Sequence, residues 1–346
     1  MQKISPEEIK MVSLKDISQK CGVSIATVSK ALNNQMDISD ETKKMVRRVA
    51  DEMGYYPNAS ARALRTRHSN TIGVLFVDEA RSGLTHDFFS NVLDAFKVTA
   101  EEKGYDILFI NRKIGSRSTT YLEHCRYRGV DGVVMACINF QDEEIRELVM
   151  SEIPVVTIDY TFEGKMAVVS DNVQGMRDLT SYVYQMGHRK IAYIHGADSS
   201  VTRSRMGSFY RTLEELGVSI PDEYVKDGVY RDTVSAAERT KELLELKNRP
   251  TCILYPDDFA AMGGMGMIRS MGLRIPEDIS VAGYDGILLA KAMIPELTTL
   301  SQDTEKIGST AAEKLISMIE RPKTTIPVRT VIPGHVLEGQ SVRKIG

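Results

Sequence analysis

Two groups of residues in this 346-residue chain are suited, by residue type and position, to bind a ligand or a nucleic acid. The first follows a Gly22-Val23 break, where Ser24 opens a short segment rich in Ser, Thr and Lys. Such side chains at the start of a helix are suited to bind phosphate and the edges of DNA bases. The second group consists of aspartates that follow short apolar runs: Asp78, Asp159, Asp257, Asp258 and Asp285.

The first group needs two short helices in tandem to position it. Apolar residues recur at helical spacing on both sides of the break, and a helix of about eight residues is marginal alone. We therefore expect the two helices to share an apolar seam. A third helix, capped by Ser39 and stopped at Gly54, closes this seam into a small core. The seam comprises Leu14, Ile17, Val23, Val28, Ala31 and Leu32.

The second helix of this pair has one inward and one outward face. Val28 and Ala31 face inward, and Ser24 caps the helix. The outward face then carries Ile25, Ala26, Ser29 and Lys30. This pattern is typical of a helix-turn-helix whose second helix enters the DNA major groove. A helical hairpin that contacts another protein has the same spacing and remains an alternative at this point.

The charge of the chain is unevenly distributed. The net charge is −3, but residues 1–70 carry 12 Lys and Arg against 8 Asp and Glu. The remaining residues carry 32 basic against 39 acidic side chains. A basic amino-terminal part on an acidic body predicts that a polyanion meets the amino-terminal part alone.

The second group of residues depends on a different architecture. From Ile72 onward, short apolar runs alternate with amphipathic segments of helical length, which predicts an α/β fold with two parallel sheets flanked by helices. Ligands of such folds bind at the carboxyl ends of the strands, where the aspartates lie. The apolar runs are TIGVLFV, YDILFI, DGVVMA, IPVVTID, KIAYIHG, TCILYPD and ISVAGYD.

Several classes of protein do not fit the sequence. No run approaches the roughly 18 apolar residues of a membrane span, and the first residues are polar and acidic rather than a signal peptide, so we expect a cytoplasmic protein. Four scattered cysteines and six dispersed histidines predict no disulfide framework, metal site or cofactor. No nucleophile elbow, zinc-protease motif or phosphate loop is present, so we expect no enzyme activity. An enzyme and a periplasmic sugar-binding protein are the alternatives.

Several motifs in a fixed order make the chain similar, almost end to end, to the lac-repressor-like (LacI/GalR) family of bacterial transcription regulators. The motifs are LKDISQKCGVSIATVSKALNN, YYPNASARAL, DNVQG, MGHRKIAYIHG, GLRIPEDISVAGYDG and PELTTLSQDTEKIGSTAAEKL. The resemblance implies a helix-turn-helix head at 1–57, a hinge helix and linker at 58–70, and a periplasmic-binding-protein-like effector-binding core at 71–346. It places the N-lobe at about 71–169 plus 300–322 and the C-lobe at about 170–299 plus 323–346.

The resemblance also implies which residues contact DNA. Base edges are read by Ile25, Ala26, Ser29 and Lys30, with Ser24, Thr27 and Asn33 as further phosphate or edge contacts. In the hinge helix, Asn58 is the cap, Ala61 allows close packing of two such helices, Arg62 contacts phosphate and Leu64 enters the minor groove. We expect a homodimer on a pseudo-palindromic double-stranded operator, acting as a repressor.

The resemblance implies that a small-molecule effector, a sugar or related polyol, binds between the two lobes. The residues implied are Asp78, Phe88, Phe89, Asp159, Arg205, Tyr230, Asp257, Asp285 and Gln302. Asp257 stands where relatives usually carry Asn, and a further carboxylate favours a neutral or amine-bearing polyol. The sequence leaves open whether the effector releases DNA or promotes its binding.

Overall fold

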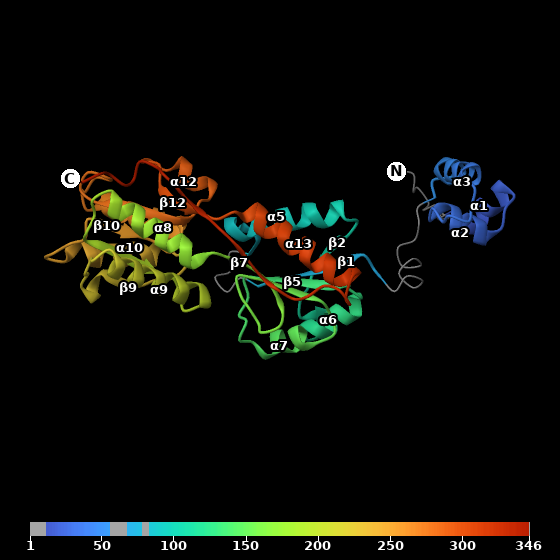
Figure 1. The fold of residues 1–346 in the computed structure, drawn as a ribbon, viewed down its shortest axis with the longest axis horizontal. Coiled ribbons are helices and arrows are strands. Elements are labelled where there is room, and N and C mark those ends of the chain that lie inside the picture. Colours follow the sequence, from blue (N-terminus) through green and yellow to red (C-terminus); the bar gives the residue numbers. More distant parts are fainter. Residues whose placement is uncertain (1–11, 56–67, 78–82, 346) are drawn as a thin grey trace, which may run out of the picture. The chain divides into compact units, whose positions relative to one another are not determined.

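The structure, a computed structural model, describes residues 12–55, 68–77 and 83–345 (Figure 1). The chain forms two compact units, Met1–Ser69 and Asn70–Gly346. Among the described residues, no helix has the length and apolar character that crossing a membrane requires.

In its described residues, chiefly 12–55, the first unit (the head) has three helices around one small core. The helices are α1 (Leu14–Cys21), α2 (Ile25–Leu32) and α3 (Asp40–Glu52). Ile17, Val28 and Ala31 are fully buried and pack against Val46 and Val49 of α3. All six residues of the predicted seam belong to this cluster, so the predicted core is confirmed.

Local sequence signals set the ends of these helices. Gly22 ends α1 in the left-handed conformation, with φ of 68°. Ser24 caps α2 by accepting a 3.1 Å hydrogen bond from the Thr27 backbone N–H. Ser39 caps α3 through the Thr42 backbone N–H at 3.3 Å, as predicted. Because each cap satisfies a backbone group that the helix itself leaves unpaired, the three short helices have defined lengths.

The second unit, the body, contains two six-stranded sheets, one in each of two lobes. The N-lobe sheet has the order β13-β7-β6-β5-β1-β2 and the C-lobe sheet the order β14-β12-β11-β10-β8-β9. Neighbouring strands are parallel except for β14, which pairs antiparallel with β12. The N-lobe strands are β1 (Thr71–Phe76), β2 (Asp106–Phe109), β5 (Gly132–Ala136), β6 (Val155–Ile158), β7 (Met166–Ser170) and β13 (Arg329–Ile332). The C-lobe strands are β8 (Ile191–His195), β9 (Val225–Asp227), β10 (Cys252–Leu254), β11 (Ser280–Asp285), β12 (Thr298–Ser301) and β14 (His335–Leu337).

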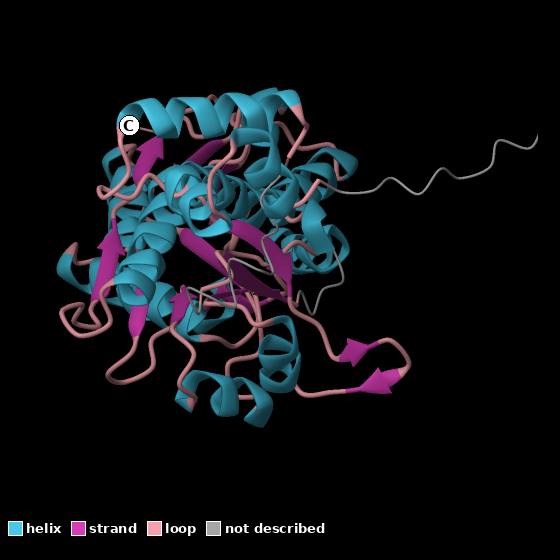
Figure 2. Cartoon of the chain, turned by 90° about the vertical axis from the view of Figure 1, so that its right-hand side faces the viewer, coloured by secondary structure: helices cyan, strands magenta, loops and turns pink. Residues whose placement is uncertain are grey.

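Helices cover both faces of each sheet (Figures 1 and 2). The N-lobe helices are α5 (Asp87–Glu102), α6 (Tyr121–Arg128), α7 (Glu143–Met150) and α13 (Thr304–Glu320). The C-lobe helices are α8 (Asn172–Gln185), α9 (Ser200–Glu215), α10 (Thr233–Glu245), α11 (Asp258–Ser270) and α12 (Leu288–Ala292). Short 3-10 turns at Gly83–Thr85 and Asp222–Tyr224 and a hairpin of β3 (Lys113–Ile114) and β4 (Arg117–Ser118) complete the elements.

The strands read as continuous apolar runs because both of their faces are buried. In β1, Val74 packs in the core beneath α5 and α13, whereas the next residue, Leu75, packs in the core beneath α6 and α7. In β8, Tyr193 and Ile194 divide between two cores in the same way. The predicted two-lobed α/β architecture with parallel sheets is therefore confirmed.

The lobe boundaries differ from those expected near the end of the chain. Residues 300–322 were expected in the N-lobe and 323–346 in the C-lobe, but β12 runs to Ser301 in the C-lobe sheet. Strand β13 lies in the N-lobe sheet, where Thr330 is paired with Val168 of β7. Without β13, the backbone N–H and C=O groups along the outer edge of β7 would have no strand to pair with, and the returning chain supplies that strand. The chain therefore crosses between the lobes after β7, after β12 and after β13.

A buried histidine fastens the end of the chain to the C-lobe. The His188 ring nitrogens lie 2.9 Å from Thr251 Oγ1 and 3.1 Å from the Arg343 carbonyl oxygen. The preceding Gly187 has φ of 97°, and a Cβ there would meet the Ile345 carbonyl oxygen at 1.8 Å. Burial lowers the pKa of His188 from 6.5 to about 4.

This lowered pKa predicts an acid-sensitive C-lobe. Since the unfolded state takes up the proton first, the free energy of unfolding falls as the pH decreases from about 6.5 to about 4. We expect His188→Gln to be less stable near neutral pH and to lose part of this pH dependence, on the order of 1–3 kcal/mol across the window. Chemical denaturation at several pH values measures both effects.

The matched control is His335→Gln, which changes an exposed histidine on β14 of the same lobe. It should retain the wild-type slope of stability against pH. A His188→Gln slope equal to that of wild type and of the control contradicts the prediction.

Candidate functional site

The outward face of α2 is exposed in the way a recognition helix requires. Ile25 is 47% exposed, and Ala26 and Lys30 are exposed beside it, whereas Val28 and Ala31 on the opposite face are fully buried. A large apolar side chain that stays in water on a short helix is available for an apolar contact, such as a thymine methyl group.

Several of the predicted DNA contacts also bond within the head. The Thr27 hydroxyl lies 2.9 Å from Ser24 Oγ, and the Asn33 side-chain amide donates to the Ser29 carbonyl at 2.5 Å. These bonds fix side-chain orientations at the two ends of α2.

The ammonium group of Lys30 forms an ion pair with Asp37, in the loop between α2 and α3. The Lys30 hydrogen bond lowers the pKa of the Asp37 carboxyl. Asp37 was not predicted from the sequence, because it lies seven residues after Lys30 across a loop and follows no helical or strand spacing.

Five of the predicted site residues lie outside the described residues, and their placement stays a prediction. They are Asn58, Ala61, Arg62 and Leu64 of the expected hinge helix, and Asp78 after β1.

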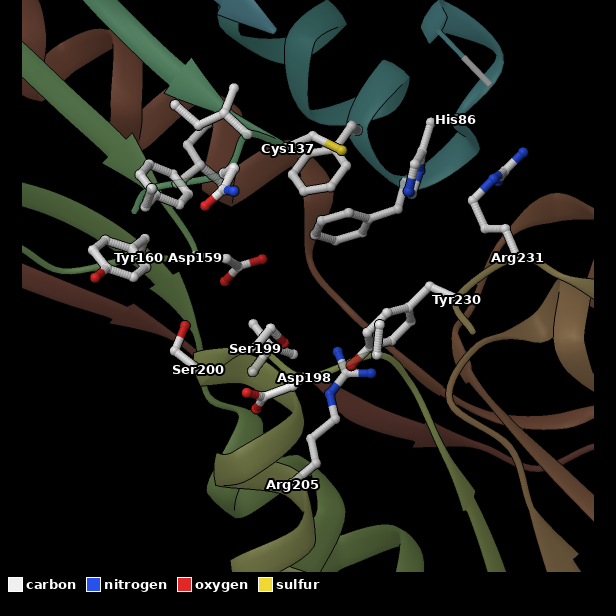
Figure 3. Close-up of a pocket in the computed structure, with 18 of the residues that line it drawn as sticks. His86, Cys137, Asp159, Tyr160, Asp198, Ser199, Ser200, Arg205, Tyr230 and Arg231 are labelled. Carbon is white, nitrogen blue, oxygen red and sulfur yellow. The ribbon is translucent and has the colours of Figure 1, made fainter. Parts of the chain in front are cut away.

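A cavity of about 810 Å³ lies between the two lobes of the body (Figure 3). Its walls come from the carboxyl ends of strands in both sheets and from the first turns of α5 and α9. The cavity brings together seven residues predicted from the sequence: Phe88, Phe89, Asp159, Arg205, Tyr230, Asp285 and Gln302.

The chain around this cavity adopts unusual backbone conformations. Four residues that line it have positive φ although none is glycine: Cys137 (52°), Asp159 (56°), Arg231 (60°) and Asp285 (110°). Such conformations cost free energy of order 1 kcal/mol or more and cluster at binding sites, where the surrounding structure imposes them. Cys137 and Asp159 directly follow β5 and β6, and Asp285 ends β11, so the turns away from the strands shape the walls.

Arg205 is a buried cation at one end of the cavity. It is only 4% exposed, and its guanidinium lies 3.5 Å from the centroid of the Tyr284 ring. Its Nε donates to Asn172 Oδ1 at 2.8 Å and its Nη1 donates to the Pro256 carbonyl at 2.9 Å. These bonds use part of its five N–H groups, which leaves donors for a ligand.

Three oxygen acceptors accompany this donor. Gln302 Nε2 donates to Asp285 Oδ1 at 2.6 Å, and the Ser170 backbone N–H donates to Asp159 Oδ1 at 2.7 Å. The buried Gln302 Oε1 has no hydrogen-bond partner among the described residues. Burial raises the pKa of Asp159, and it raises that of Asp285 well above its ordinary value against the opposing effect of Arg205. The set suits a ligand whose hydroxyl groups both donate and accept.

Aromatic side chains form the apolar walls. Phe140 and Tyr160 stack with ring centroids 4.3 Å apart, and Phe89 packs edge-on against Phe88 at 4.9 Å. Phe140 and Tyr160 were not among the residues predicted from the sequence. Their position just after the apolar runs DGVVMA and IPVVTID was the available signal, because the strand ends meet at the cavity.

Asp257 does not line the cavity, contrary to the prediction from the sequence. Its Oδ1 accepts from the Ala260 N–H at 2.8 Å as the cap of α11, and its Oδ2 accepts from the Arg231 backbone N–H at 2.7 Å. Because Asp257 is 2% exposed and lies outside the cavity lining, it offers no acceptor to a ligand there. The inference from Asp257 to a neutral or amine-bearing polyol therefore loses its basis.

Comparison with known proteins identifies the family. Residues 13–58 match the bacterial regulatory proteins of the lacI family, and residues 180–342 match the periplasmic binding protein-like domain. The repressor PurR of Vibrio atlanticus is 32% identical over 317 residues, covering 90% of this chain and 92% of the relative. The chain belongs to the LacI family. A probable repressor of Bacillus subtilis, ExuR, is 31% identical, with 91% and 93% covered.

Solved structures agree with this membership. The lac repressor dimer bound to operator and the anti-inducer ONPF is 25% identical, with a TM-score of 0.80 and coverage of 96% of this chain and 100% of that one. A complex of the transcriptional regulator CelR with cellobiose has a TM-score of 0.69 at 25% identity, covering 95% and 99%. This LacI-family chain is a DNA-binding transcription regulator, and its relatives are repressors rather than enzymes, which agrees with the expectation of no enzyme activity.

The position of the Tyr230 ring in the cavity depends on Gly196. A Cβ at Gly196 would lie 2.2 Å from the Tyr230 ring, so Gly196→Ala must displace that ring from its place in the cavity. We expect at least a tenfold loss of affinity for whichever small molecule stabilises the wild-type chain in a thermal-shift screen. Isothermal titration calorimetry measures the loss.

Gly207→Ala is the matched control, because no atom lies within 4 Å of a Cβ at this position in α9. The control should bind as wild type does. Equal affinities of the two alanine variants contradict the assigned role of Gly196.

Proposed function

We propose that this regulator represses transcription from a pseudo-palindromic operator, and that a sugar or related polyol bound between the lobes controls its operator affinity. The observation that carries the effector assignment is that one cavity with aromatic walls contains both the buried donor Arg205 and the acceptors Asp285 and Gln302. Aromatic faces pack against the apolar faces of sugar rings, while the polar groups orient the hydroxyl groups.

The proposed repressor acts as a homodimer. A single head offers one short recognition helix, whose few base contacts give little specificity, and two heads on a two-fold site double them. The structural relative with the TM-score of 0.80 is a lac repressor dimer on its operator, which supports the same arrangement here. In this proposal residues 1–57 form the head, 58–70 the hinge and linker, and 71–346 the core.

Direct readout in the proposed complex comes from the outward face of α2. Ile25 and Ala26 contact thymine methyl groups, and Lys30 and Ser29 contact base edges. Ser24, Thr27 and Asn33 contact phosphate or neighbouring edges and set the register of the head. In the hinge, Arg62 contacts phosphate, and Leu64 enters the minor groove after Asn58 has capped a helix that Ala61 allows to pack against its partner.

Control by the effector follows from linkage. An effector that binds one relative position of the lobes more tightly than another shifts the population toward the first. The difference between the two binding free energies sets the size of the shift. If the two positions differ in operator affinity, the effector changes that affinity by the same coupling free energy.

The decisive experiment selects bound sequences from a random pool of double-stranded DNA. A two-fold symmetric consensus, followed by a change in its affinity on addition of one member of a panel of sugars and polyols, is the expected result. Absence of any preferred sequence contradicts the proposed operator binding. A consensus that responds to no member of the panel contradicts the effector class alone.

The Lys30–Asp37 ion pair yields a prediction on salt dependence. Asp37→Asn frees the ammonium of Lys30 and removes a negative charge close to it. We expect tighter binding to non-operator DNA and a plot of log affinity against log salt that is steeper by about one unit. Fluorescence anisotropy titrations at several salt concentrations measure this slope.

The same substitution in a Lys30→Met background tests whether Lys30 carries the effect. The slope should then stay at the value for Lys30→Met alone. A slope that increases equally in both backgrounds shows that Asp37 acts without Lys30 and contradicts the prediction.

A further inference from the structure

One ion pair at the edge of the cavity joins the lobes directly. Arg231 belongs to the C-lobe, and its Nη1 lies 3.3 Å from Oδ2 of Asp87, the first residue of α5 in the N-lobe. Its Nη2 donates to the Thr85 carbonyl oxygen at 3.1 Å. Both lobes are therefore held together at a point that is distant in sequence from the three chain crossings.

Arg231 is held in place before it reaches the other lobe. Its backbone has φ of 60°, and its N–H donates to Asp257 Oδ2 at 2.7 Å. Its guanidinium lies 4.1 Å from the centroid of the Phe259 ring, near the start of α11. Because these contacts restrict the side chain, little conformational entropy remains to be lost when the ion pair forms.

Burial distinguishes this pair from ordinary surface pairs. The side chain of Arg231 is 12% exposed and that of Asp87 is 43% exposed. Exposed pairs contribute little because water and salt screen them, whereas a partly buried and oriented guanidinium is screened less. Asp87 also lies in the first turn of α5, where the helix dipole favours a negative charge.

The same turn of α5 carries part of the cavity wall. Phe88 and Phe89 follow Asp87 directly, and both line the cavity. A ligand that displaces the Phe89 ring thus acts on the turn that carries the Asp87 carboxylate. The polar end of Arg231 is engaged by the N-lobe, at the side of the cavity away from Tyr160 (Figure 3).

We propose that the Asp87–Arg231 pair is a latch that holds the two lobes together, with Asp257 as the residue that positions Arg231. Arg231 thus acts by positioning the two lobes relative to each other. Any effect of the latch on effector binding rests on the proposed function. The contact between the lobes does not.

Hydrogen–deuterium exchange of the full chain, without effector and without DNA, tests the latch. The readout is the exchange rate of cavity-lining segments 137–141 and 197–201, which lie in different lobes and contain neither substituted residue. Asp87→Asn and Arg231→Gln should each speed exchange in both segments at least threefold. In wild type, 1 M salt should produce a smaller change than either substitution, because a partly buried pair is screened less than an exposed one.

The double variant separates a latch from two local effects. If the residues act through one pair, Asp87→Asn with Arg231→Gln exchanges no faster than either single variant. Lys226→Gln is the matched control, since Lys226 of β9 pairs with Glu242 of its own lobe, neither residue lies in a readout segment, and the variant should exchange as wild type does.

Three results overturn the latch: single variants that exchange like the Lys226→Gln control, effects that multiply in the double variant, or acceleration in one lobe alone. Circular dichroism confirms that each variant is folded. Loss of operator binding in a separate assay bears on the proposed function and leaves these exchange results unaffected.

Discussion

The arrangement of the C-lobe depends on one constraint, the permanently charged guanidinium of Arg205 that is buried at one end of the cavity. Removing such a group from water costs several kcal/mol unless hydrogen bonds and an electron-rich surface replace the lost hydration. Three elements supply that replacement for Arg205: Asn172 at the start of α8, the Pro256 carbonyl before α11, and the Tyr284 ring in β11. Because α8 begins where the chain has just left the N-lobe sheet, the Asn172 bond ties Arg205 to the part of the fold that joins the lobes.

The head could be predicted closely because its determinants are local. Apolar spacing defined the seam from Leu14 to Leu32, and the caps at Ser24 and Ser39 each involve a backbone N–H three residues away. The position of the cavity could also be predicted. Parallel strands bring their carboxyl ends to one edge of a sheet, and Asp159 and Asp285 lie at such edges.

Contacts between residues distant in sequence could not be predicted. Asp257 follows an apolar run as Asp285 does, yet it caps α11 and binds the Arg231 backbone, and the sequence does not show which partner a carboxylate will take. The position of β13 likewise depends on which sheet edge is free after α13, a property of the assembled lobes. Arg231 joins the lobes from a left-handed backbone position, and nothing in the sequence around it indicates either that conformation or its partner Asp87.

The three crossings of the chain between the lobes bear on how such a regulator can be recombined. Neither lobe is a continuous stretch of polypeptide, since the N-lobe ends at β7 and resumes with α13 and β13. Grafting one lobe from a relative therefore requires three matched junctions, all at the border across which the cavity forms. Exchange of the amino-terminal unit requires a single junction near residue 70. Homologous shuffling within this architecture should therefore exchange DNA specificity far more readily than it exchanges half of a ligand site.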